Sequence, residues 1–420
     1  MNADLITIGD ELLIGQVINT NAAWAGEQLS LAGVDVLRMV TLGDDIEAIQ
    51  AALADAYRTS ELVIVTGGLG PTHDDITREA IAGFFGAELR LDPDVLAHIA
   101  ARFARRGYDI PASNQRQAMV PEGFEVLPNP VGTAPGLWLA EEGPPARLLA
   151  VVPGVPHEMR ALMEGEVLPR LRKRKGLRFI RHRTLLTAGI GESNLQERLG
   201  DLSGWLSDGL RLAYLPGGGS VRLRASASGD YQQAVERRLD AFEAHLRERI
   251  GPYFFGTGTE TLEAVVGQML KARGQTVAVA ESCTGGFVLN RLTNVPGSSA
   301  YVVGGVVAYG NEVKAEQLGV SEAALNEEGA VSEVVARQMA EGIRERLGAD
   351  VGISTTGVAG PGGGTPEKPV GTVWIGYADA SGSEARLLSL AQDRLLNKQL
   401  TSTAVLNDLR QRLNGNAEAS

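Results

Sequence analysis

A serine stands between an apolar, β-branched run and a segment with helical character. The run covers residues 276–279, the serine is Ser282, and a helix is predicted over residues 287–292. The first N–H groups of a helix have no partner within it, so they can stabilise an anion or a developing oxyanion in front of them. Gly285 and Gly286 would let a ligand approach the backbone closely. The pattern indicates a nucleophilic serine, and it equally fits an ordinary N-cap.

A lysine follows a second buried-strand pattern further along the chain. That pattern covers residues 302–310, includes Tyr309 and ends shortly before Lys314, one of six lysines among 39 Lys and Arg. A lysine past a strand end, downstream of Ser282, suggests a Ser/Lys pair, in which Tyr309 would relay a proton or orient the substrate. The amine would have to be neutral, and burial or neighbouring cations can lower its pKa. From the spacing alone, a solvated lysine on a helix face is the simpler alternative.

A glycine-rich loop follows a short apolar run in the first half of the chain. The run covers residues 61–66, and Gly67, Gly68 and Gly70 come directly after it. Glycines let the backbone fold tightly around a phosphate, and a helix predicted to begin near Asp75 would point its N–H groups inward. The loop is not a Walker A loop, because no Gly-Lys-Ser/Thr ends it.

Acidic residues accompany this loop and suggest a metal ion. Asp74 and Asp75 would repel a phosphate unless a divalent cation lay between them, and carboxylate oxygens suit magnesium or manganese. We predict Asp10, Asp44 and Asp75, all at strand ends, as metal ligands. Alternatively, Asp74 and Asp75 cap the helix, and we expect that one of them does.

The composition limits the class of protein. At 420 residues the chain is expected to form two or three domains. No stretch of 18 apolar residues predicts a transmembrane helix, the N-terminus does not read as a signal peptide, and a single cysteine allows no internal disulfide, so we expect a cytoplasmic protein. The net charge of −12 argues against broad nucleic-acid binding. A basic run at 170–183 is the local exception, and we interpret it as a solvated helix end and strand face.

Three segments with different patterns must position these residues. Residues 1–165 alternate strands and helices, which predicts a mostly parallel sheet with helices on both faces and ligands at the carboxyl ends of its strands. Residues 166–252 predict a small α+β module with a glycine hairpin at 216–219. A linker is expected at 253–259, and residues 260–420 predict an α/β domain that ends in a helix over 394–413 and a disordered tail.

Six motifs in the last segment resemble, in the same order, the C-terminal domain of the CinA (competence/damage-inducible protein A) family. They lie at 281–286, 293–300, Asn311 with Lys314, 329–333, 356–361 and 368–372. The resemblance implies a nicotinamide mononucleotide deamidase that forms nicotinate mononucleotide and ammonia without a cofactor. It implies Ser282 as nucleophile, activated by Tyr309 and Lys314.

The same resemblance implies a set of substrate-binding residues. They are Thr284, Gly285, Gly286, Asn311, Thr356, Gly357 and Arg394. Arg394 is the best candidate for the phosphate of the mononucleotide, because a guanidinium fork fits phosphate oxygens. Gln392 and Asn397 depart from the family's pattern around it, which weakens a phosphate site at this corner.

The first segment is similar to the N-terminal domain of the same family, a relative of the molybdopterin-binding proteins. The motifs lie at 9–15, 19–21, 66–72 with Asp75 and Thr77, 132–136 and 153–156. The resemblance implies a Rossmann-like ADP-ribose pyrophosphatase that forms AMP and ribose 5-phosphate with a divalent cation (Mg, Mn or Co). It implies Gly67, Gly68, Thr72 and Asp75 as the nucleotide loop. The middle segment resembles the family's KH-type domain but lacks a Gly-x-x-Gly loop, so we expect a spacer or homodimer contact rather than an RNA reader.

Three functions are compatible with these observations. The first is a bifunctional enzyme of pyridine-nucleotide recycling whose partners are small nucleotides, with no membrane or nucleic-acid partner. The second is a protein whose N-terminal half binds a nucleotide or pterin without turnover. The third is an interaction protein in competence or DNA damage, against which the net charge of −12 counts. Fold alone does not decide between them.

Overall fold

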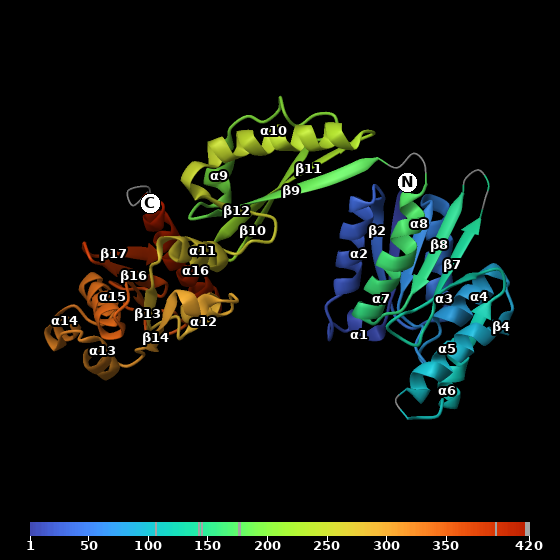
Figure 1. Cartoon of the computed structure of the whole chain (residues 1–420), viewed down its shortest axis with the longest axis horizontal. Coiled ribbons are helices and arrows are strands. Elements are labelled where there is room, and N and C mark those ends of the chain that lie inside the picture. The colour runs from blue at the N-terminus through green and yellow to red at the C-terminus, as the bar shows by residue number, and fades with distance from the viewer. Residues whose placement is uncertain (106, 142, 144–145, 175–177, 391–392, 416–420) are drawn as a thin grey trace. The chain divides into compact units, whose positions relative to one another are not determined.

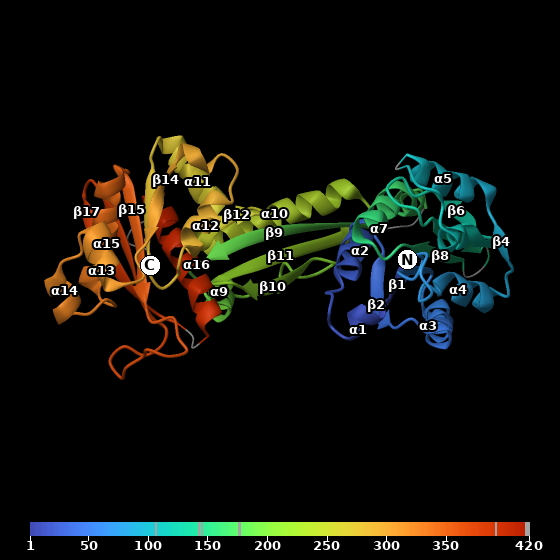
Figure 2. The same ribbon diagram turned by 90° about the horizontal axis from the view of Figure 1, so that it is seen from below.

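The chain forms two compact units, shown with their helices and strands in Figure 1 and Figure 2. The computed structural model describes residues 1–105, 107–141, 143, 146–174, 178–390 and 393–415. The first unit comprises Met1–Arg181 and Ser228–Glu236, and the second comprises His182–Ala227 and Arg237–Ser420. Among the helices so described, none is both long and apolar enough to span a membrane.

A six-stranded sheet forms the centre of the first unit. Its order is β2 (Asp35–Leu42), β1 (Asn2–Ile8), β3 (Leu62–Thr66), β8 (Arg147–Val152), β7 (Gly136–Glu141) and β6 (Glu125–Leu127). The first four strands are parallel, and β7 and β6 run antiparallel to their neighbours. Every residue of β3 is buried, as its continuous apolar run predicts.

Helices cover both faces of this sheet. One face packs against α2 (Thr20–Leu31), α7 (Pro156–Leu162), a π-helical turn (Met163–Val167) and α8 (Leu168–Arg172). The other packs against α3 (Ile46–Thr59), α4 (Thr77–Phe85) and α5 (Pro93–Ala104). Neighbouring residues of β1 divide between the two cores, since Leu5 contributes to one and Ile6 to the other. This confirms the predicted mostly parallel sheet with two covered faces.

Smaller elements complete the unit and differ in part from the prediction. They are α1 (Asp10–Leu13), α6 (Ala112–Gln115), a 3-10 turn (Arg116–Ala118) and a ribbon of β4 (Leu89–Leu91) with β5 (Met119–Pro121). Residues 10–13 were expected in a loop and form one helical turn. The boundary predicted at 165 lies inside a continuous helical segment, because Val167, Leu168 and Leu171 are buried in the core of the first unit.

The middle module is a four-stranded sheet with two helices. Its order is β10 (Arg211–Gly217), β11 (Ser220–Gly229), β9 (Phe179–Ala188) and β12 (Phe254–Thr257), with helices α9 (Glu192–Leu199) and α10 (Gln232–Ile250). The hairpin at 216–219 is confirmed, since Gly217 pairs with Ser220. The expected linker at 253–259 instead contains β12, which pairs with β9. Four residues, one of them Gly256, are too short a run to reveal an edge strand in the sequence.

A five-stranded sheet forms the C-terminal domain. Its order is β14 (Val302–Val307), β13 (Val277–Glu281), β15 (Val351–Gly357), β16 (Thr372–Asp379) and β17 (Gly382–Ser389). The first three strands are parallel and the last two antiparallel. Ser282, Ala308 and Gly357 therefore lie at the same edge, where the carboxyl ends of the parallel strands meet.

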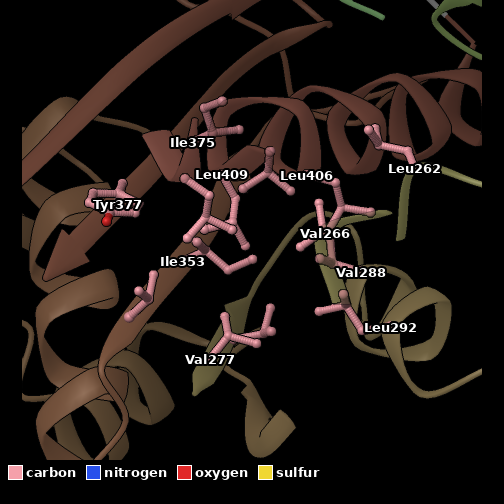
Figure 3. Packing of buried hydrophobic residues seen from close by; sticks show 14 of the residues in the cluster. Leu262, Val266, Val277, Val288, Leu292, Ile353, Ile375, Tyr377, Leu406 and Leu409 are labelled. Carbon is pink, nitrogen blue, oxygen red and sulfur yellow. The ribbon is translucent and has the colours of Figure 1, made fainter. Parts of the chain in front are cut away.

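Helices pack on both faces of this sheet as well. On one face lie α11 (Leu262–Arg273), α12 (Phe287–Thr293) and α16 (Arg394–Leu413). Figure 3 shows Val266, Val288 and Leu406 from these helices pointing toward Ile353 and Ile375 of the strands. On the other face lie α13 (Asn311–Leu318), α14 (Glu322–Glu327) and α15 (Glu333–Leu347). A 3-10 turn (Gly251–Tyr253) precedes β12, and another (Ser298–Ala300) precedes β14.

Leu406 tests how much the packing of α16 stabilises the C-terminal domain. Its side chain is fully buried, whereas Leu395 on the same helix is 74% exposed. We expect Leu406→Ala to lower the free energy of opening β13 and β15 by about 2–5 kcal/mol, because it leaves a cavity in the core. Native-state hydrogen exchange of these strands measures the change. Leu395→Ala is the control, and equal effects of the two substitutions would contradict the packing described here.

Candidate functional site

A tight turn carries Ser282 from the end of β13 toward α12. The N–H of Ser282 donates to the carbonyl of Thr355 at 2.9 Å, and the N–H of Gly285 donates to the carbonyl of Ser282 at 3.1 Å. Gly285 and Gly286 have φ values of 63° and 92°, a region that glycine adopts without strain. Ser282 is 8% exposed. Its hydroxyl makes no hydrogen bond with any residue that the structure describes, so it remains available to a ligand.

Two of the N–H groups at the start of α12 are already bound by a side chain. Val288 donates to Glu281 Oε2 at 3.1 Å, and Leu289 donates to Glu281 Oε1 at 2.8 Å. These two groups therefore do not face a ligand of Ser282, contrary to the expectation for the helix start. The alternative that a Ser or Thr caps the helix is wrong too, because the N-cap is Gly286. Sequence reasoning missed this role of Glu281. The N–H groups that it binds lie seven and eight residues later in the sequence, a separation that matches no capping pattern.

Two of the predicted substrate-binding threonines are turned into the protein. The hydroxyls of Thr284 and Thr355 hydrogen-bond at 2.7 Å, and both residues are fully buried. Thr356 donates its hydroxyl to the carbonyl of Ala330 at 2.7 Å and is 1% exposed. Gly357 is the last residue of β15. These residues hold strands and turns together around the Ser282 turn.

Lys314 is buried, although it was expected more simply on a solvated helix face. Its side chain is 1% exposed, and Nζ donates to the carbonyls of Ala308 at 2.8 Å and Tyr309 at 3.3 Å. Burial lowers the pKa of this amine, and the neighbouring Cys283 thiol offsets the effect only in part. Ala308, whose carbonyl binds Nζ, donates its N–H to the carbonyl of Glu281 at 2.7 Å, so Lys314 lies beside the strand end that carries Ser282. Burial also raises the pKa of Cys283 to about 12, so this thiol packs as an apolar side chain.

A second group of side chains lies at the surface of the same domain. Tyr309 is 61% exposed, and its hydroxyl accepts a hydrogen bond from Arg394 Nη2 at 2.9 Å. Arg394 also donates to the carbonyl of Gly360 at 2.8 Å. Asn311 is exposed at the start of α13. No hydrogen bond between described residues joins Ser282 to Tyr309 or Lys314.

Sequence reasoning also missed Lys398. Two neighbouring positions depart from the family's pattern: Asn397 is buried and donates to the carbonyl of Ala359, and Gln392 lies outside the described residues. Lys398 Nζ lies 3.4 Å from the position that a Cβ on Gly285 would occupy. A cation therefore reaches the Ser282 turn from α16, one helical turn after Arg394.

A cavity of about 420 Å³ lies at the carboxyl ends of β1, β3 and β8 in the first unit. It is lined by Ile8, Gly9, Glu11, Asp44, Gly67, Gly68, Leu69, Gly70, Pro71, Asp74, Asp75, Gln117, Thr133, Ala134, Pro153, Gly154, Val155 and Glu158. The structure thus brings together four of the predicted residues, Gly67, Gly68, Asp44 and Asp75. Thr72 and Asp10 are not among the lining residues.

The carboxylate of Asp75 organises the glycine loop. It accepts from the N–H of Gly70 at 2.7 Å, from the N–H of Thr72 at 2.8 Å and from the Thr72 hydroxyl. The N-cap of α4 is Ile76, with no side-chain cap, so the expectation that Asp74 or Asp75 caps this helix is wrong.

A buried arginine beneath the same loop was not predicted. Arg78 is 2% exposed and donates to the carbonyls of Leu69 at 2.8 Å and Gly70 at 3.2 Å. Burial lowers the pKa of its guanidinium, the opposite of what a solvated ion pair would do. Its position in the first turn of α4 gives no sign in the sequence that it is buried.

Asp10 and Asp44 lie side by side at neighbouring strand ends. The N–H of Asp10 donates to Asp44 Oδ2 at 3.2 Å, and the N–H of Asp44 donates to Asp10 Oδ1 at 3.3 Å. Burial raises the pKa of Asp44, and the nearby carboxylates of Asp10, Glu11 and Asp74 add to this. The predicted triad of Asp10, Asp44 and Asp75 is not assembled: within the described part of the chain, no three His, Cys, Asp or Glu side chains converge as metal ligands.

Comparison with known proteins identifies the family. Residues 4–173 match the model "Probable molybdopterin binding domain", residues 182–256 match "Damage-inducible protein CinA KH domain", and residues 259–413 match "CinA C-terminal domain". A CinA-like protein of Salinibacter ruber is 57% identical over 413 residues, which cover 98% of this chain and 100% of the relative. The chain belongs to the CinA family.

A CinA-like protein of Chloroherpeton thalassium is 47% identical over 422 residues, covering 99% of this chain and 100% of the relative. The family models and these full-length relatives confirm the CinA resemblance and the α/β fold class with its KH-type middle module. A crystal structure of the protein CinA from Thermoplasma acidophilum is 40% identical with a TM-score of 0.37, covering 40% of this chain and 97% of that one.

Burial of Lys314 gives a test that needs no substrate. We expect one of the six lysines to titrate below the ordinary value of 10.5, because desolvation disfavours its charged form. The Cε signals of labelled lysine, followed by NMR across pH in the full chain, measure this. Lys314→Met removes that signal and so assigns it, and Lys271→Met, at an exposed position, is the control substitution. Six lysines that titrate together would refute the lowered pKa.

Proposed function

We propose that the C-terminal domain hydrolyses the carboxamide of nicotinamide mononucleotide to nicotinate mononucleotide and ammonia. The observation that carries this proposal is a buried lysine of lowered pKa that binds the strand end beside the turn of Ser282, whose hydroxyl makes no hydrogen bond with a described residue. A desolvated amine can act as a general base, and a serine needs such a base to become a nucleophile.

The hydrogen bonds of Lys314 suit a neutral amine. Such an amine has two N–H donors and one lone pair. The carbonyls of Ala308 and Tyr309 use both donors and leave the lone pair for a proton. In the proposed reaction Lys314 takes the proton of Ser282 while the oxygen of Ser282 attacks the carboxamide carbon. The proton then passes to the departing nitrogen, ammonia leaves, and water hydrolyses the ester.

Cations near the turn can hold the phosphate of the substrate. Arg394 and Lys398 lie on one side of α16, and Tyr309 receives one of the hydrogen bonds of Arg394. A guanidinium and an ammonium bind a phosphate at the surface without a metal ion, which agrees with a deamidase that needs no cofactor.

Ser282→Ala tests the nucleophile. We expect ammonia release from nicotinamide mononucleotide to fall by about a thousandfold or more, because the covalent route is removed. Cys283→Ala is the matched control. The Cys283 thiol is buried next to Ser282, and we expect its removal to leave most of the rate intact. Substantial ammonia release by Ser282→Ala would remove Ser282 as nucleophile. Inactivity of wild type with this substrate would favour a binding protein or a competence-related interaction protein.

We further propose that the first unit hydrolyses ADP-ribose to AMP and ribose 5-phosphate with a divalent cation, Mg, Mn or Co. Its cavity is lined by the glycine loop and by the side chains of Glu11, Asp44 and Asp74. The negative charges of these neighbouring carboxylates favour binding of a cation. Magnesium is often bound by one or two carboxylates and substrate phosphates, so an incomplete protein cage fits it. Asp44 with Glu11 or Asp74 would hold the ion, which would offset the charge that develops on the diphosphate.

Two substitutions separate metal binding from loop order. We expect Asp44→Asn to raise the cation concentration needed for ADP-ribose cleavage at least about tenfold, because a ligand loses its charge. We expect Asp75→Asn to weaken nucleotide binding at every cation concentration, because Asp75 holds the loop. Glu27→Gln, at an exposed site, is the control. Cleavage of ADP-ribose without any divalent cation would contradict the proposal. Unchanged deamidation by each variant verifies that it is folded.

A further inference from the structure

The middle module is fixed to the C-terminal domain within the second compact unit. Thr403 on α16 donates its hydroxyl to the carbonyl of Gly218 in the glycine hairpin at 2.8 Å. Arg410 on the same helix is 2% exposed and donates to the carbonyls of Phe254 at 2.9 Å and Pro252 at 2.6 Å. These hydrogen bonds hold the sheet of the module against α16, so a hollow at their junction is preorganised for a ligand.

Such a hollow, of about 210 Å³, lies at this junction. Strands β9, β11 and β12 contribute residues from the middle module, and α11, α12 and α16 contribute residues from the C-terminal domain. The size suits a small metabolite better than a nucleotide. Part of the lining is apolar and can cover a short hydrocarbon group, and it consists of Leu186, Ala188, Phe255 and Leu262.

Four charged residues also line the hollow, and two of them neutralise each other. Arg291 on α12 donates to Glu263 Oε2 with Nε at 3.3 Å and with Nη2 at 2.7 Å. Its Nη1 donates to the hydroxyls of Ser402 at 2.8 Å and Thr403 at 3.1 Å. All three nitrogens of Arg291 are thus bound within the protein, so this pair adds no free charge to the hollow.

The other two charged residues, Arg222 and Glu260, have opposite charges and are not paired. Both line the hollow, yet neither forms an ion pair with any residue that the structure describes. Glu260 Oε2 accepts from the N–H of Thr257 at 2.7 Å, and no described group donates to its Oε1. Both side chains are exposed, so water solvates them when the hollow is empty. The hollow therefore offers one free cation and one free carboxylate beside an apolar lining.

We propose that this hollow binds a free amino acid with an aliphatic side chain. The α-carboxylate pairs with the guanidinium of Arg222, whose fork fits two carboxylate oxygens. The α-ammonium group pairs with Glu260, and the side chain lies against the apolar lining. A simple anion or a simple amine would leave one of the two charges unmatched. The proposal depends on neither of the two activities proposed above.

An amino acid in this hollow would contact helices that support the Ser282 turn. Arg291 lies on α12, which follows the turn directly, and Thr403 lies on α16, the helix that carries Arg394 and Lys398. The same ligand would contact the sheet of the middle module through Arg222. Bound ligand therefore stabilises the junction between the module and the C-terminal domain.

Calorimetry of the full chain with amino acids and their analogues tests the proposal without turnover. The probes are L-valine, L-leucine, 4-methylpentanoate and isoamylamine. The last two keep the side chain of leucine, but the first of them lacks the ammonium group and the second lacks the carboxylate. We expect L-leucine to bind at least about tenfold more tightly than either analogue, because each loses one charge-assisted hydrogen bond. Binding of neither amino acid, or equal binding of L-leucine and 4-methylpentanoate, would overturn the proposal.

Two substitutions locate the binding in this hollow. We expect Arg222→Gln and Glu260→Gln each to weaken L-leucine at least about tenfold, because each removes one of the charges. Glu260→Gln should leave the binding of 4-methylpentanoate unchanged, since that analogue has no ammonium group. Arg224→Gln is the matched control, because Arg224 is exposed on the same strand and does not line the hollow. Undiminished L-leucine binding by Arg222→Gln and Glu260→Gln, or an equal loss in Arg224→Gln, would refute this site.

Discussion

The geometry of the Ser282 turn depends on the buried carboxylate of Glu281. A charge that is 1% exposed must be hydrogen-bonded, and the N–H groups of Val288 and Leu289 meet this need. The positive end of the α12 dipole stabilises the same charge. Because strand end and helix start are thus joined, the residues between them can only form a tight turn, and two glycines supply its left-handed backbone. The position of Ser282 follows from this clamp.

The first unit uses an acidic side chain in a comparable way. Asp75 binds the N–H groups of Gly70 and Thr72, and Arg78 binds the carbonyls of Leu69 and Gly70 from below. The loop is therefore ordered by its own chain before any ligand arrives. In both domains the carboxylate next to the glycine motif arranges backbone, and the chemistry falls to other groups. An acid beside a glycine motif in a sequence is thus an ambiguous sign of a metal ligand.

Local pattern predicted the fold well and the site in part. Continuous apolar runs such as that of β3 are visible in the sequence because burial on both faces demands them. Burial of Lys314 is not visible, because it depends on how β14 and the later helix α15 pack around α13, which the local sequence pattern does not encode. The same holds for Arg78 beneath its loop and for β12, whose partner β9 lies some 70 residues earlier. The resemblance to the CinA family named Ser282 and Lys314, but it gave no sign of the roles of Glu281 and Lys398.

The two proposed activities differ in their need for a metal ion, and the charges around each site supply a reason. Both substrates are anions that carry phosphate. At the Ser282 turn, Arg394 and Lys398 offer cations, so a phosphate can bind directly. In the cavity of the first unit, Glu11, Asp44 and Asp74 line the wall, and no Lys or Arg is among the described lining residues. The guanidinium of Arg78 donates to loop carbonyls beneath the loop. An anion can approach such a wall only with a cation between them. A divalent ion in one site and none in the other is therefore what the electrostatics of each domain predicts.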